Sequence, residues 1–465
     1  MKIAYLHFHL KAGGVTSVIK HQVQAVEPDN ETLVISSSDK CTFCNGSAVC
    51  VPELGYDSDQ EAPANALMLA DKIQKAITDK WPSGCDVLHV HNPTLNKNSF
   101  LIDALNILQE RGIRFFLQIH DFAEDGRPNA YYKDPYPENA HYGVINSRDY
   151  AVLLKAGLKE QGVHYVPNQV VPFPEWEVSN SGYILYPVRG IRRKNTGEAI
   201  LLSLFSPKDH PVAVTLPPNS SWEKKIHSMW RNLIRDKRLN VHLDIGLNED
   251  FETLVRTAYF IITTSVNEGF GFAFLEPWTA LKNVFGRRIE HVCKDFEETG
   301  MIFNDFYSRI LIPIDFFDME KFCLRREELI VKFGRLFGVE PDKHRINRSS
   351  YQLSEKGLID FGMLDEQSQK QVILNLADNE KKRNRIKAIN PHLEKMRISK
   401  EDAEVINENR QVVVREYSRD KYRQRLLDVY SKVINVDVSH SINKKVVLES
   451  FFNPVTFCIL RWPDV

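Results

Sequence analysis

Two glutamates frame a segment of glycine and large apolar residues in the second half of the chain. Glu268 and Glu276 are separated by Gly269–Leu275, which includes three phenylalanines. A buried segment avoids an unpaired carboxylate, because burying that charge costs several kcal/mol. A surface segment seldom carries so many large apolar side chains. We therefore predict that this segment forms the lip of a ligand-binding pocket.

The expected local structure separates the two carboxylates along a ligand. A strand expected over 259–264 runs into a loop at 265–271, and a helix is expected to begin near Phe272. Glu268 then lies in the loop, and Glu276 lies about one turn into the helix. Carboxylates accept hydrogen bonds from vicinal hydroxyls, so a ligand with two diol groups could use both.

The residues between the two glutamates favour the close approach of a ligand. Gly269 and Gly271 have no side chain that would keep a ligand away from the backbone. Phe270 and Phe272 would exclude water on the flanks.

Two further turns follow expected strands and have the composition of phosphate-binding turns. Gly13 and Gly14 precede a helix expected over 15–26, whose N-terminus offers free N–H groups and a positive dipole end. The turn matches neither a dinucleotide fingerprint nor a P-loop, so a plain tight turn remains an alternative. Arg189 and Lys194 could clamp a diphosphate, the arginine in a bidentate fork, and a solvated basic loop is the alternative reading.

The elements that must position these residues follow a strand–helix alternation in the first third of the chain. The expected strands cover 2–8, 31–36, 86–90, 114–119 and 144–146, and the expected helices cover 15–26, 64–80 and 100–111. Such alternation is typical of a mostly parallel sheet covered by helices on both faces.

A second alternation begins after the Pro- and Ser-rich stretch 167–181. Here the expected strands cover 183–188, 212–216, 240–244 and 259–264, and the expected helices cover 196–204, 222–235 and 249–258. Residues 365–430 are expected to be mainly helical, with apolar residues at helical spacing over 411–434. The segment 451–460 could be a docking segment. The chain therefore predicts two successive α/β units and a helical C-terminal part.

Composition is that of an ordinary folded protein. The chain has 465 residues, 43% of them hydrophobic and 26% charged, and its net charge is −1. Nucleic acid and anionic membranes are therefore not favoured as main partners. No apolar run is long enough to span a membrane, and the N-terminus is too polar for a signal peptide, so we expect a cytoplasmic protein.

Three of the seven cysteines are clustered. Cys41, Cys44 and Cys50 could form part of a zinc site with a distant fourth ligand. The alternative is that they are free thiols in a surface loop.

The motifs together resemble a known family. Glu268 and Glu276 with Gly-Phe-Gly between them resemble the E-x7-E motif of retaining nucleotide-sugar glycosyltransferases of the GT-B fold, family four. Four more motifs are similar in the same order: Gly13-Gly14, Ile119-His-Asp-Phe122, Pro167-Asn168 and Arg189-x4-Lys194. The chain departs from the family pattern at Asn195, at Pro277-Trp278 and at Gly286-Arg-Arg288, which leaves the identity of the donor open.

The resemblance implies a two-domain architecture. It predicts two Rossmann-like α/β domains that face a central cleft, with a C-terminal helical segment. The N-terminal, acceptor-side domain would cover 1–170, the linker 171–182 and the donor-side domain 183–405. Residues 406–465 would form a helix and tail that pack back on the N-terminal domain.

The resemblance also assigns donor-binding roles. Glu276 would hold the ribose hydroxyls, Glu268 the hydroxyls of the donor sugar, and Arg189 and Lys194 the diphosphate leaving group. The full expected donor-binding set is Gly13, Gly14, Arg189, Lys194, Glu268, Gly269, Phe270, Gly271 and Glu276. No metal and no cofactor are expected.

On the acceptor side, His120 would lie near the outer hydroxyls of the sugar and the acceptor, and a core histidine at a strand end is the alternative. His9, His91, Asn92 and Asp121 are further acceptor-side candidates. The expected catalytic set is His120, Glu268, Arg189 and Lys194. Transfer is expected to retain the anomeric configuration, with the departing phosphate oxygen helping to deprotonate the acceptor.

Other functions stay open. A GT-B phosphorylase or epimerase would share the fold, and a nucleotide-sugar-binding protein or degenerate partner subunit could keep the same residues without catalysis. An NAD-dependent dehydrogenase is disfavoured because its fingerprint is missing. No exposed basic amphipathic helix is visible in the N-terminal half, which favours a soluble acceptor over a lipid. Homo-oligomerisation is left open.

Overall fold

The computed structural model describes residues 1–38, 41–44, 47–59, 65–177, 179–340, 342, 346, 349–350, 352–397 and 402–463. Two compact units make up the chain, and each is formed by two separate stretches. Unit 1 comprises Met1–Gln169 and Tyr417–Phe452, and unit 2 comprises Val170–Glu416 and Asn453–Val465. No helix among the described residues is both long and apolar enough to cross a membrane.

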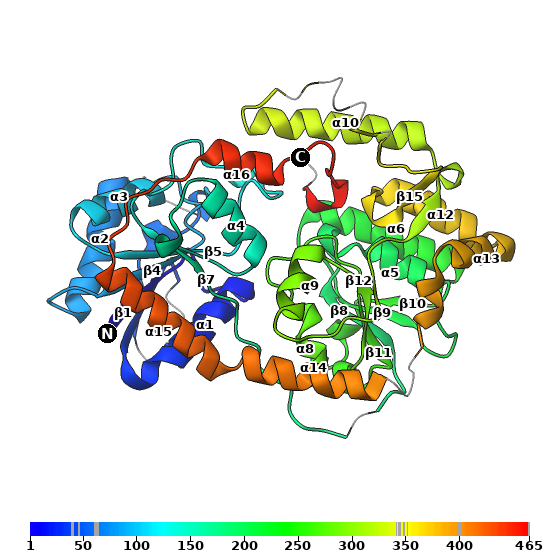
Figure 1. Ribbon diagram of the computed structural model, residues 1–465, viewed down its shortest axis with the longest axis horizontal. Helices are drawn as coiled ribbons and strands as arrows, with labels where there is room; N and C mark the ends of the chain where they lie inside the picture. The colour runs from blue at the N-terminus through cyan, green and yellow to red at the C-terminus, as the bar shows by residue number, and fades with distance from the viewer. Residues whose placement is uncertain are drawn as a thin grey trace. The chain divides into compact units, whose positions relative to one another are not determined.

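Unit 1 is built on a seven-stranded sheet of order β3-β2-β1-β4-β5-β6-β7 in which all neighbours are parallel. The strands are β1 Lys2–Leu6, β2 Glu31–Ser36, β3 Ala48–Cys50, β4 Val87–His91, β5 Phe115–Ile119, β6 His141–Val144 and β7 Val163–Tyr165. The helices are α1 Gly14–Val26, α2 Ala66–Lys80, α3 Leu101–Glu110, α4 Ser147–Lys155, α15 Arg419–Asn435 and α16 Lys444–Phe451. Figure 1 shows these elements.

Two hydrophobic clusters cover the two faces of this sheet. One joins the sheet to α2, α3, α4 and α16, and the other joins it to α1 and α15. The central strands β1, β4 and β5 are buried on both faces, which explains their nearly continuous apolar sequences.

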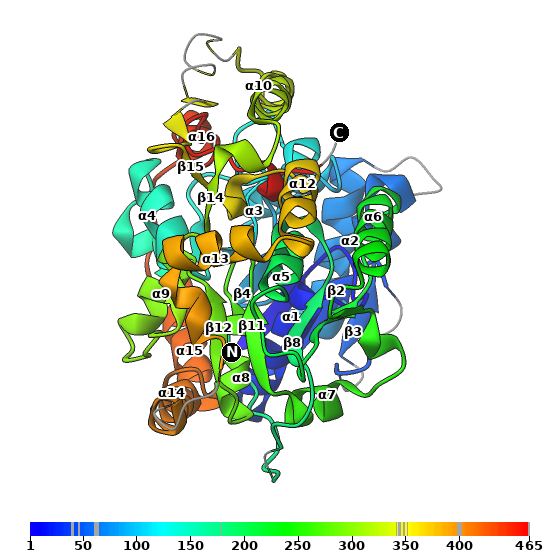
Figure 2. The same ribbon diagram turned by 90° about the vertical axis from the view of Figure 1, so that its right-hand side faces the viewer.

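Unit 2 contains a six-stranded parallel sheet of order β10-β9-β8-β11-β12-β13 and a two-stranded antiparallel sheet of β14 and β15. The strands are β8 Ile184–Arg189, β9 Val212–Leu216, β10 Val241–Leu243, β11 Phe260–Thr263, β12 Val284–Arg287, β13 Phe306–Tyr307, β14 Leu311–Pro313 and β15 Leu358–Asp360. The α-helices are α5 Thr196–Leu202, α6 Ser221–Lys237, α7 Phe251–Thr257, α8 Glu276–Thr279, α9 Glu290–Glu297, α10 Met319–Leu336, α12 Glu366–Ala377, α13 Glu380–Ile389 and α14 Asp402–Glu416. Helix α12 packs against α5 and α6, and α14 packs against α8 (Figures 1 and 2).

Both sheets share one strand order, and this order locates the candidate sites. In each sheet the chain first moves outward in one direction and then returns to add strands on the other side of the first strand. Ligands of such sheets bind at the carboxyl ends of the strands where the direction reverses. This position, the topological switch point of the sheet, lies between β1 and β4 in unit 1 and between β8 and β11 in unit 2.

Several expectations about the C-terminal part need correction. The apolar repeat over 411–434 belongs to two helices, because α14 ends at Glu416 and Ser418 caps α15 by accepting a hydrogen bond from the Lys421 N–H (3.3 Å). The expected tail 406–465 is also divided between the units. Tyr417–Phe452 belong to unit 1, whereas α14 and Asn453–Val465 belong to unit 2.

The cysteine cluster takes a form that neither alternative anticipated. Cys41 and Cys44 form a disulfide, while the exposed Cys50 donates from its thiol to the Ser37 oxygen (3.3 Å). No group of three or more His, Cys, Asp or Glu side chains within the described residues could hold a metal ion. The zinc hypothesis for this cluster is therefore wrong as far as the described part of the chain reaches.

Candidate functional site

The switch point of unit 2 joins two loops that are far apart in the sequence. Lys194 lies in the short 3-10 helix η6 Arg192–Lys194, after β8, and Thr264 and Ser265 follow β11. The Tyr186 hydroxyl donates to the Lys194 oxygen (2.8 Å) and contacts the Ser265 hydroxyl (2.9 Å). The Thr264 hydroxyl donates to the backbone oxygens of Lys194 (3.0 Å) and Asn195 (3.1 Å). These contacts hold two loops together: the basic loop after β8, which contains Arg192–Lys194, and the glutamate loop after β11, which contains Glu268.

Glu268 is the acidic centre of this site. Its carboxylate is buried and pairs with the Lys194 ammonium and with Nη1 of Arg193 (3.0 Å). Burial alone would raise the pKa of Glu268, but the two cations outweigh it and lower that pKa to about 2. Burial lowers the pKa of Lys194, and Glu268 opposes this shift. Glu268 is therefore ionised at neutral pH, between two positive charges.

Glu276 has the opposite environment. It is the first residue of α8, which is a correction to the expected position one turn inside a helix. Among the described residues, no hydrogen-bond donor contacts its carboxylate. Burial raises the pKa of Glu276 to about 7, and nearby Lys194 opposes the shift only partly. A carboxylate in this state can accept hydrogen bonds from a ligand.

The basic loop differs from the expected clamp in one residue. Arg189 lies at the end of β8, but its Nη1 donates to the Pro217 oxygen (2.6 Å) and to Oδ1 of Asn219 (2.8 Å). Arg193 instead contacts Glu268, and it also donates to the Asn267 oxygen (3.1 Å). Arg193 was not among the site residues predicted from the sequence. The run of three basic residues at 192–194 was the available signal.

The glycine and phenylalanine residues between the glutamates have structural reasons of their own. Gly271 has φ of +95°, and a Cβ there would lie 2.6 Å from Cγ1 of Val292. Phe270 is buried, with its ring against Phe272 (5.0 Å between centroids) and Phe296 (5.7 Å). Their donor-binding roles, like that of Gly269, stay predictions.

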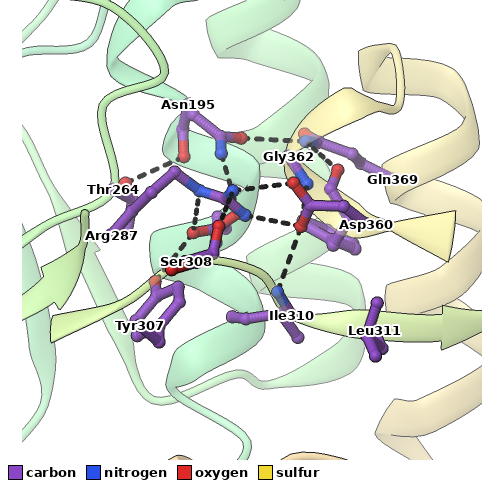
Figure 3. A network of polar contacts seen from close by, with 12 residues as sticks. Asn195, Thr264, Arg287, Tyr307, Ser308, Ile310, Leu311, Asp360, Gly362 and Gln369 are labelled. Atoms are coloured by element: carbon purple, nitrogen blue, oxygen red, sulfur yellow. Dashed lines mark hydrogen bonds and ion pairs between the residues drawn. The ribbon is translucent and has the colours of Figure 1, made fainter. Parts of the chain in front are cut away.

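A buried polar network contacts Asn195, the residue that follows the basic loop (Figure 3). Arg287 of β12 binds the Glu198 carboxylate through Nε (2.9 Å) and Nη2 (2.6 Å), and binds Asp360 through Nη1 (2.8 Å) and Nη2 (2.9 Å). The Tyr307 hydroxyl also donates to Glu198 (2.7 Å). Burial would lower the pKa of Arg287, but Asp360 and Glu198 raise it instead. The guanidinium stays charged and joins β12, α5 and β15.

Asn195 connects this network to Lys194. It has φ of +53°, a left-handed conformation that asparagine tolerates better than most residues. Its Nδ2 donates to Glu198 (2.9 Å), and its Oδ1 accepts from Nε2 of Gln369 (2.8 Å). The structure thus gives a physical reason for two of the departures from the family pattern, Asn195 and Arg287. Both belong to one network.

The glycine turn of unit 1 leaves space at the start of α1. Gly13 precedes the helix without a side-chain cap, and Gly14 is its first residue. A Cβ on Gly14 would meet nothing within 4 Å, and one on Gly13 would lie 3.8 Å from the Lys11 oxygen. Neither the packing nor a positive φ of these residues requires glycine here. Open space beside a helix N-terminus is compatible with an anionic ligand.

The switch point of unit 1 carries a histidine group made of His7, His91 and His120, in which the rings of His91 and His120 are stacked. His91 and His120 share a hydrogen bond between Nδ1 and Nε2 (2.9 Å), and Nδ1 of His7 contacts the His91 oxygen (3.4 Å). Burial lowers the pKa of His120 to about 4 and that of His7 to about 3. These rings are therefore neutral at pH 7. His7 was not among the site residues predicted from the sequence.

The remaining acceptor-side candidates surround this group. Asn92 has φ of +52°, and its Oδ1 accepts from the backbone N–H of His120 (2.7 Å) and Asp121 (3.2 Å). The Asp121 carboxylate pairs with Arg127 (2.6 Å). Nε2 of His9 contacts the Tyr56 hydroxyl (3.1 Å). All candidates of this half of the chain lie at or just beyond the carboxyl ends of β1, β4 and β5, except Gly13 and Gly14 at the start of α1.

Comparisons with known proteins agree with this architecture. No protein-family model matches the chain. Mannosylglucosyl-3-phosphoglycerate synthase from Petrotoga mobilis is 27% identical over 429 residues, which cover 83% of either chain. The chain is therefore similar in sequence to a glycosyltransferase.

Solved structures share the fold at low sequence identity. HepE from Anabaena, solved with UDP and glucose, has a TM-score of 0.52 at 10% identity, over 93% of this chain and 99% of that one. A glycosyltransferase from Rickettsia africae has a TM-score of 0.53 at 14% identity, over 94% and 99%. Sucrose-phosphate synthase from Thermosynechococcus elongatus has a TM-score of 0.52 at 12% identity, over 92% and 98%. The chain has the GT-B fold. The resemblance to GT-B glycosyltransferases is confirmed, while membership of family four stays a prediction.

Proposed function

We propose that the protein is a retaining glycosyltransferase that moves a hexose from a nucleotide-diphosphate sugar to a hydroxyl of a small acceptor. One observation carries the proposal: the pKa values of two glutamates at the switch point of unit 2 are shifted in opposite directions. Glu268 is ionised between Lys194 and Arg193, and no hydrogen-bond donor among the described residues contacts the Glu276 carboxylate, whose pKa is raised to about 7. A ligand with phosphate charge and two sets of hydroxyls would satisfy all four side chains.

The donor would be recognised by unit 2. Lys194 and Arg193 would stabilise the negative charge that develops on the diphosphate as the glycosidic bond breaks, and such fixed charges are often the largest catalytic contribution. Glu268 would orient this pair and accept hydrogen bonds from the sugar. Glu276 would accept hydrogen bonds from the ribose. We propose that these cations supply the charge stabilisation without a metal ion.

The acceptor would be recognised by unit 1. His120 is neutral at pH 7, so it would exchange hydrogen bonds with hydroxyl groups instead of binding an anion. We propose that the departing phosphate oxygen takes the proton of the acceptor hydroxyl, which keeps the anomeric configuration. The name of the Petrotoga relative includes a sugar joined to 3-phosphoglycerate, which supports a small polar acceptor.

Donor binding tests the proposal directly. The melting temperature and heat of binding would be measured with a panel of nucleoside diphosphates and nucleotide sugars, for the wild type, Lys194→Ala and the matched control Lys225→Ala. Lys225 is exposed on α6 of the same unit. A ligand at about 100 times its Kd adds roughly 2.7 kcal/mol to the stability of the protein that binds it. We expect one nucleotide class to bind the wild type and the control, and Lys194→Ala to weaken its binding about tenfold or more.

Turnover with the identified donor then tests catalysis. NMR of the product is expected to show the anomeric configuration of the donor. An inverted product would contradict the retaining assignment, and binding without any turnover would identify a nucleotide-sugar-binding protein.

A further inference from the structure

The loop that follows β4 in unit 1 is tied to two other segments of that unit. The backbone N–H of Asn96 donates to the Ala130 oxygen (2.8 Å), and that of Asp57 donates to the Lys97 oxygen (2.9 Å). The loop, the segment 56–59 and the segment 127–130 therefore form one connected surface. This surface lies beside the histidine group, because Asn92 at the start of the loop binds the His120 N–H.

Lys97 and Arg127 bring two positive charges together on this surface. The Lys97 side chain is half-buried, and its Nζ lies 5.6 Å from the centroid of the Tyr56 ring. Among the described residues no carboxylate pairs with its ammonium. Burial lowers the pKa of Lys97, and the neighbouring Arg127 lowers it further. The folded chain thus holds a desolvated cation next to a second cation, which costs free energy unless an anion joins them.

The carboxylates of this surface have partners other than Lys97, and the Asp57 carboxylate accepts from the backbone N–H of Ser99 (3.1 Å). Asp121 pairs with Arg127 (2.6 Å), and both side chains stay partly exposed. Lys11 pairs with Asp59 (3.3 Å). Arginine has five N–H donors in a planar fork, so Arg127 can bind an anion while it keeps its contact with Asp121.

Neutral polar groups surround the two cations. Nε2 of His9 contacts the Tyr56 hydroxyl (3.1 Å), and burial lowers the pKa of His9. The Thr94 hydroxyl and Oδ1 of Asn96 are buried without a hydrogen-bond partner. Buried polar atoms of this kind are nearly always satisfied in folded proteins, and exceptions tend to mark sites that bind water or a ligand.

We propose that Lys97 and Arg127 form a phosphate subsite in unit 1 that binds a phosphate group of the acceptor. The proposal deepens the proposed function and rests on it, because it names the acceptor as a phosphorylated hydroxyl compound. A phosphate monoester carries between one and two negative charges at pH 7, and its oxygens suit both an ammonium and a guanidinium fork. The uncharged side chains around the cations would contact the hydroxyl-bearing part of the acceptor.

Calorimetric titration with 3-phosphoglycerate as the probe tests this subsite. The wild type would be compared with Lys97→Met, Arg127→Met and the matched control Lys80→Met, an exposed lysine of α2 in the same unit. We expect the wild type and the control to bind the probe, and each of the first two variants to bind about tenfold more weakly or worse. Glycerate, which keeps the carboxylate but lacks the phosphate, is expected not to bind.

Lys194→Ala separates this subsite from the donor site of unit 2, which also has cations for phosphate. We expect Lys194→Ala to bind 3-phosphoglycerate like the wild type. If Lys194→Ala loses the probe while Lys97→Met keeps it, the phosphate belongs to unit 2 and the proposal is overturned. No binding of millimolar probe by the wild type overturns it as well.

Two controls keep the outcome independent of folding and of the proposed function. The melting temperature of Lys97→Met is expected to equal or exceed that of the wild type, because methionine removes the cost of burying the ammonium. A marked fall in that temperature would assign Lys97 a structural role and overturn the proposal. Nucleotide binding by Lys97→Met is expected to be unchanged. Failure of every nucleotide to bind the wild type would refute the proposed function, whatever the phosphate probe shows.

Discussion

At the residue scale, the two glutamates of unit 2 show how environment decides the chemistry of identical side chains. Glu268 and Glu276 are both substantially buried, and burial alone would raise the pKa of each. Two cations contact Glu268, so its pKa is lowered to about 2, whereas Glu276 keeps a raised pKa of about 7. Titratable groups whose pKa values are pushed apart are typical of functional sites.

The raised pKa of Glu276 predicts a pH dependence of donor binding. An ionised carboxylate accepts stronger hydrogen bonds from ribose hydroxyls than a protonated one. We therefore expect affinity for the nucleotide sugar to rise as pH increases through about 7, and Glu276→Gln to weaken binding and flatten this dependence. Calorimetric titration between pH 6 and 8 would measure both. The nucleotide sugar is the better ligand here, since the terminal phosphate of a free nucleotide itself titrates near pH 6. An unchanged pH profile in Glu276→Gln would contradict the assignment.

The raised pKa of Glu276 also predicts how the stability of the ligand-free protein depends on pH. This measurement serves as a control for the binding experiment. Because the folded-state pKa lies above the ordinary value of 4.5, the contribution of Glu276 to stability is fully present below pH 4.5 and is lost as pH rises through about 7. Denaturant unfolding should show this loss in the wild type and a smaller one in Glu276→Gln. Binding and stability thus change in opposite directions with pH.

Residue types and spacing predicted part of this site. Lys194, Glu268 and Glu276 were chosen from the sequence, and the structure brings Lys194 and Glu268 into contact. Arg189 was chosen as well, but Arg193 is the arginine that contacts Glu268. Sequence spacing cannot decide between them, because the direction of each side chain depends on how the chain turns after β8.

At the element scale, the start of α5 depends on Asn195. Its left-handed backbone ends η6 and begins α5, and its side chain is bound at both ends by Glu198 and Gln369. Glu198 is in turn held by Arg287. The backbone immediately after Lys194 is thus positioned by a buried network that spans three elements.

Two substitutions of Asn195 separate the backbone from the side-chain contribution. Asn195→Gly and Asn195→Ala both lose the two side-chain hydrogen bonds, but only alanine is strained in the left-handed conformation. We expect both to lower the free energy of unfolding, with Asn195→Ala lower than Asn195→Gly by about 1 kcal/mol. Denaturant titration of the two variants would measure the difference. Equal stability of the two variants would show that the left-handed conformation imposes no such cost.

The strands and helices were predicted where the apolar pattern is regular. β2 and β9 have the expected bounds, and α1, α3 and α6 lie within two residues of the expected ones. β6 was expected over 144–146 but covers His141–Val144, because Asn146 instead caps α4 by accepting from the Asp149 N–H (2.8 Å). Helix caps compete with strand propensity at such junctions.

At the scale of the whole molecule, the chain leaves unit 2 after Glu416 and returns to it at Asn453. Arg326 of α10 is fully buried there and donates to the backbone oxygens of Phe457 (3.1 Å) and Pro454. The ring of Phe457 stacks on Trp462 (5.3 Å) and lies 6.1 Å from that of Phe333. The last segment is thus an integral part of unit 2.

Two substitutions within this segment test its contribution. Phe457 is 2% exposed, and Phe457→Ala is expected to destabilise unit 2 by about 3–5 kcal/mol through the lost burial and the cavity. Val455 is 40% exposed, and Val455→Ala is expected to change stability by less than about 0.5 kcal/mol. Hydrogen exchange, read separately for peptides of the two units, would measure this. If the peptides of unit 2 are equally protected from hydrogen exchange in Phe457→Ala and Val455→Ala, the segment does not stabilise unit 2.

The sequence by itself determined the architecture and placed Lys194, Glu268 and Glu276 at the switch point of unit 2. Regular apolar strands that alternate with amphipathic helices can bury their faces only in parallel layered sheets, and the chemically active residues follow the strands. Tertiary structure alone decided which arginine meets Glu268, where Lys97 lies relative to Arg127, and to which unit the last segment returns. Apolar residues specify that a segment is buried but not against which surface, and charges far apart in sequence interact only after the strands are placed.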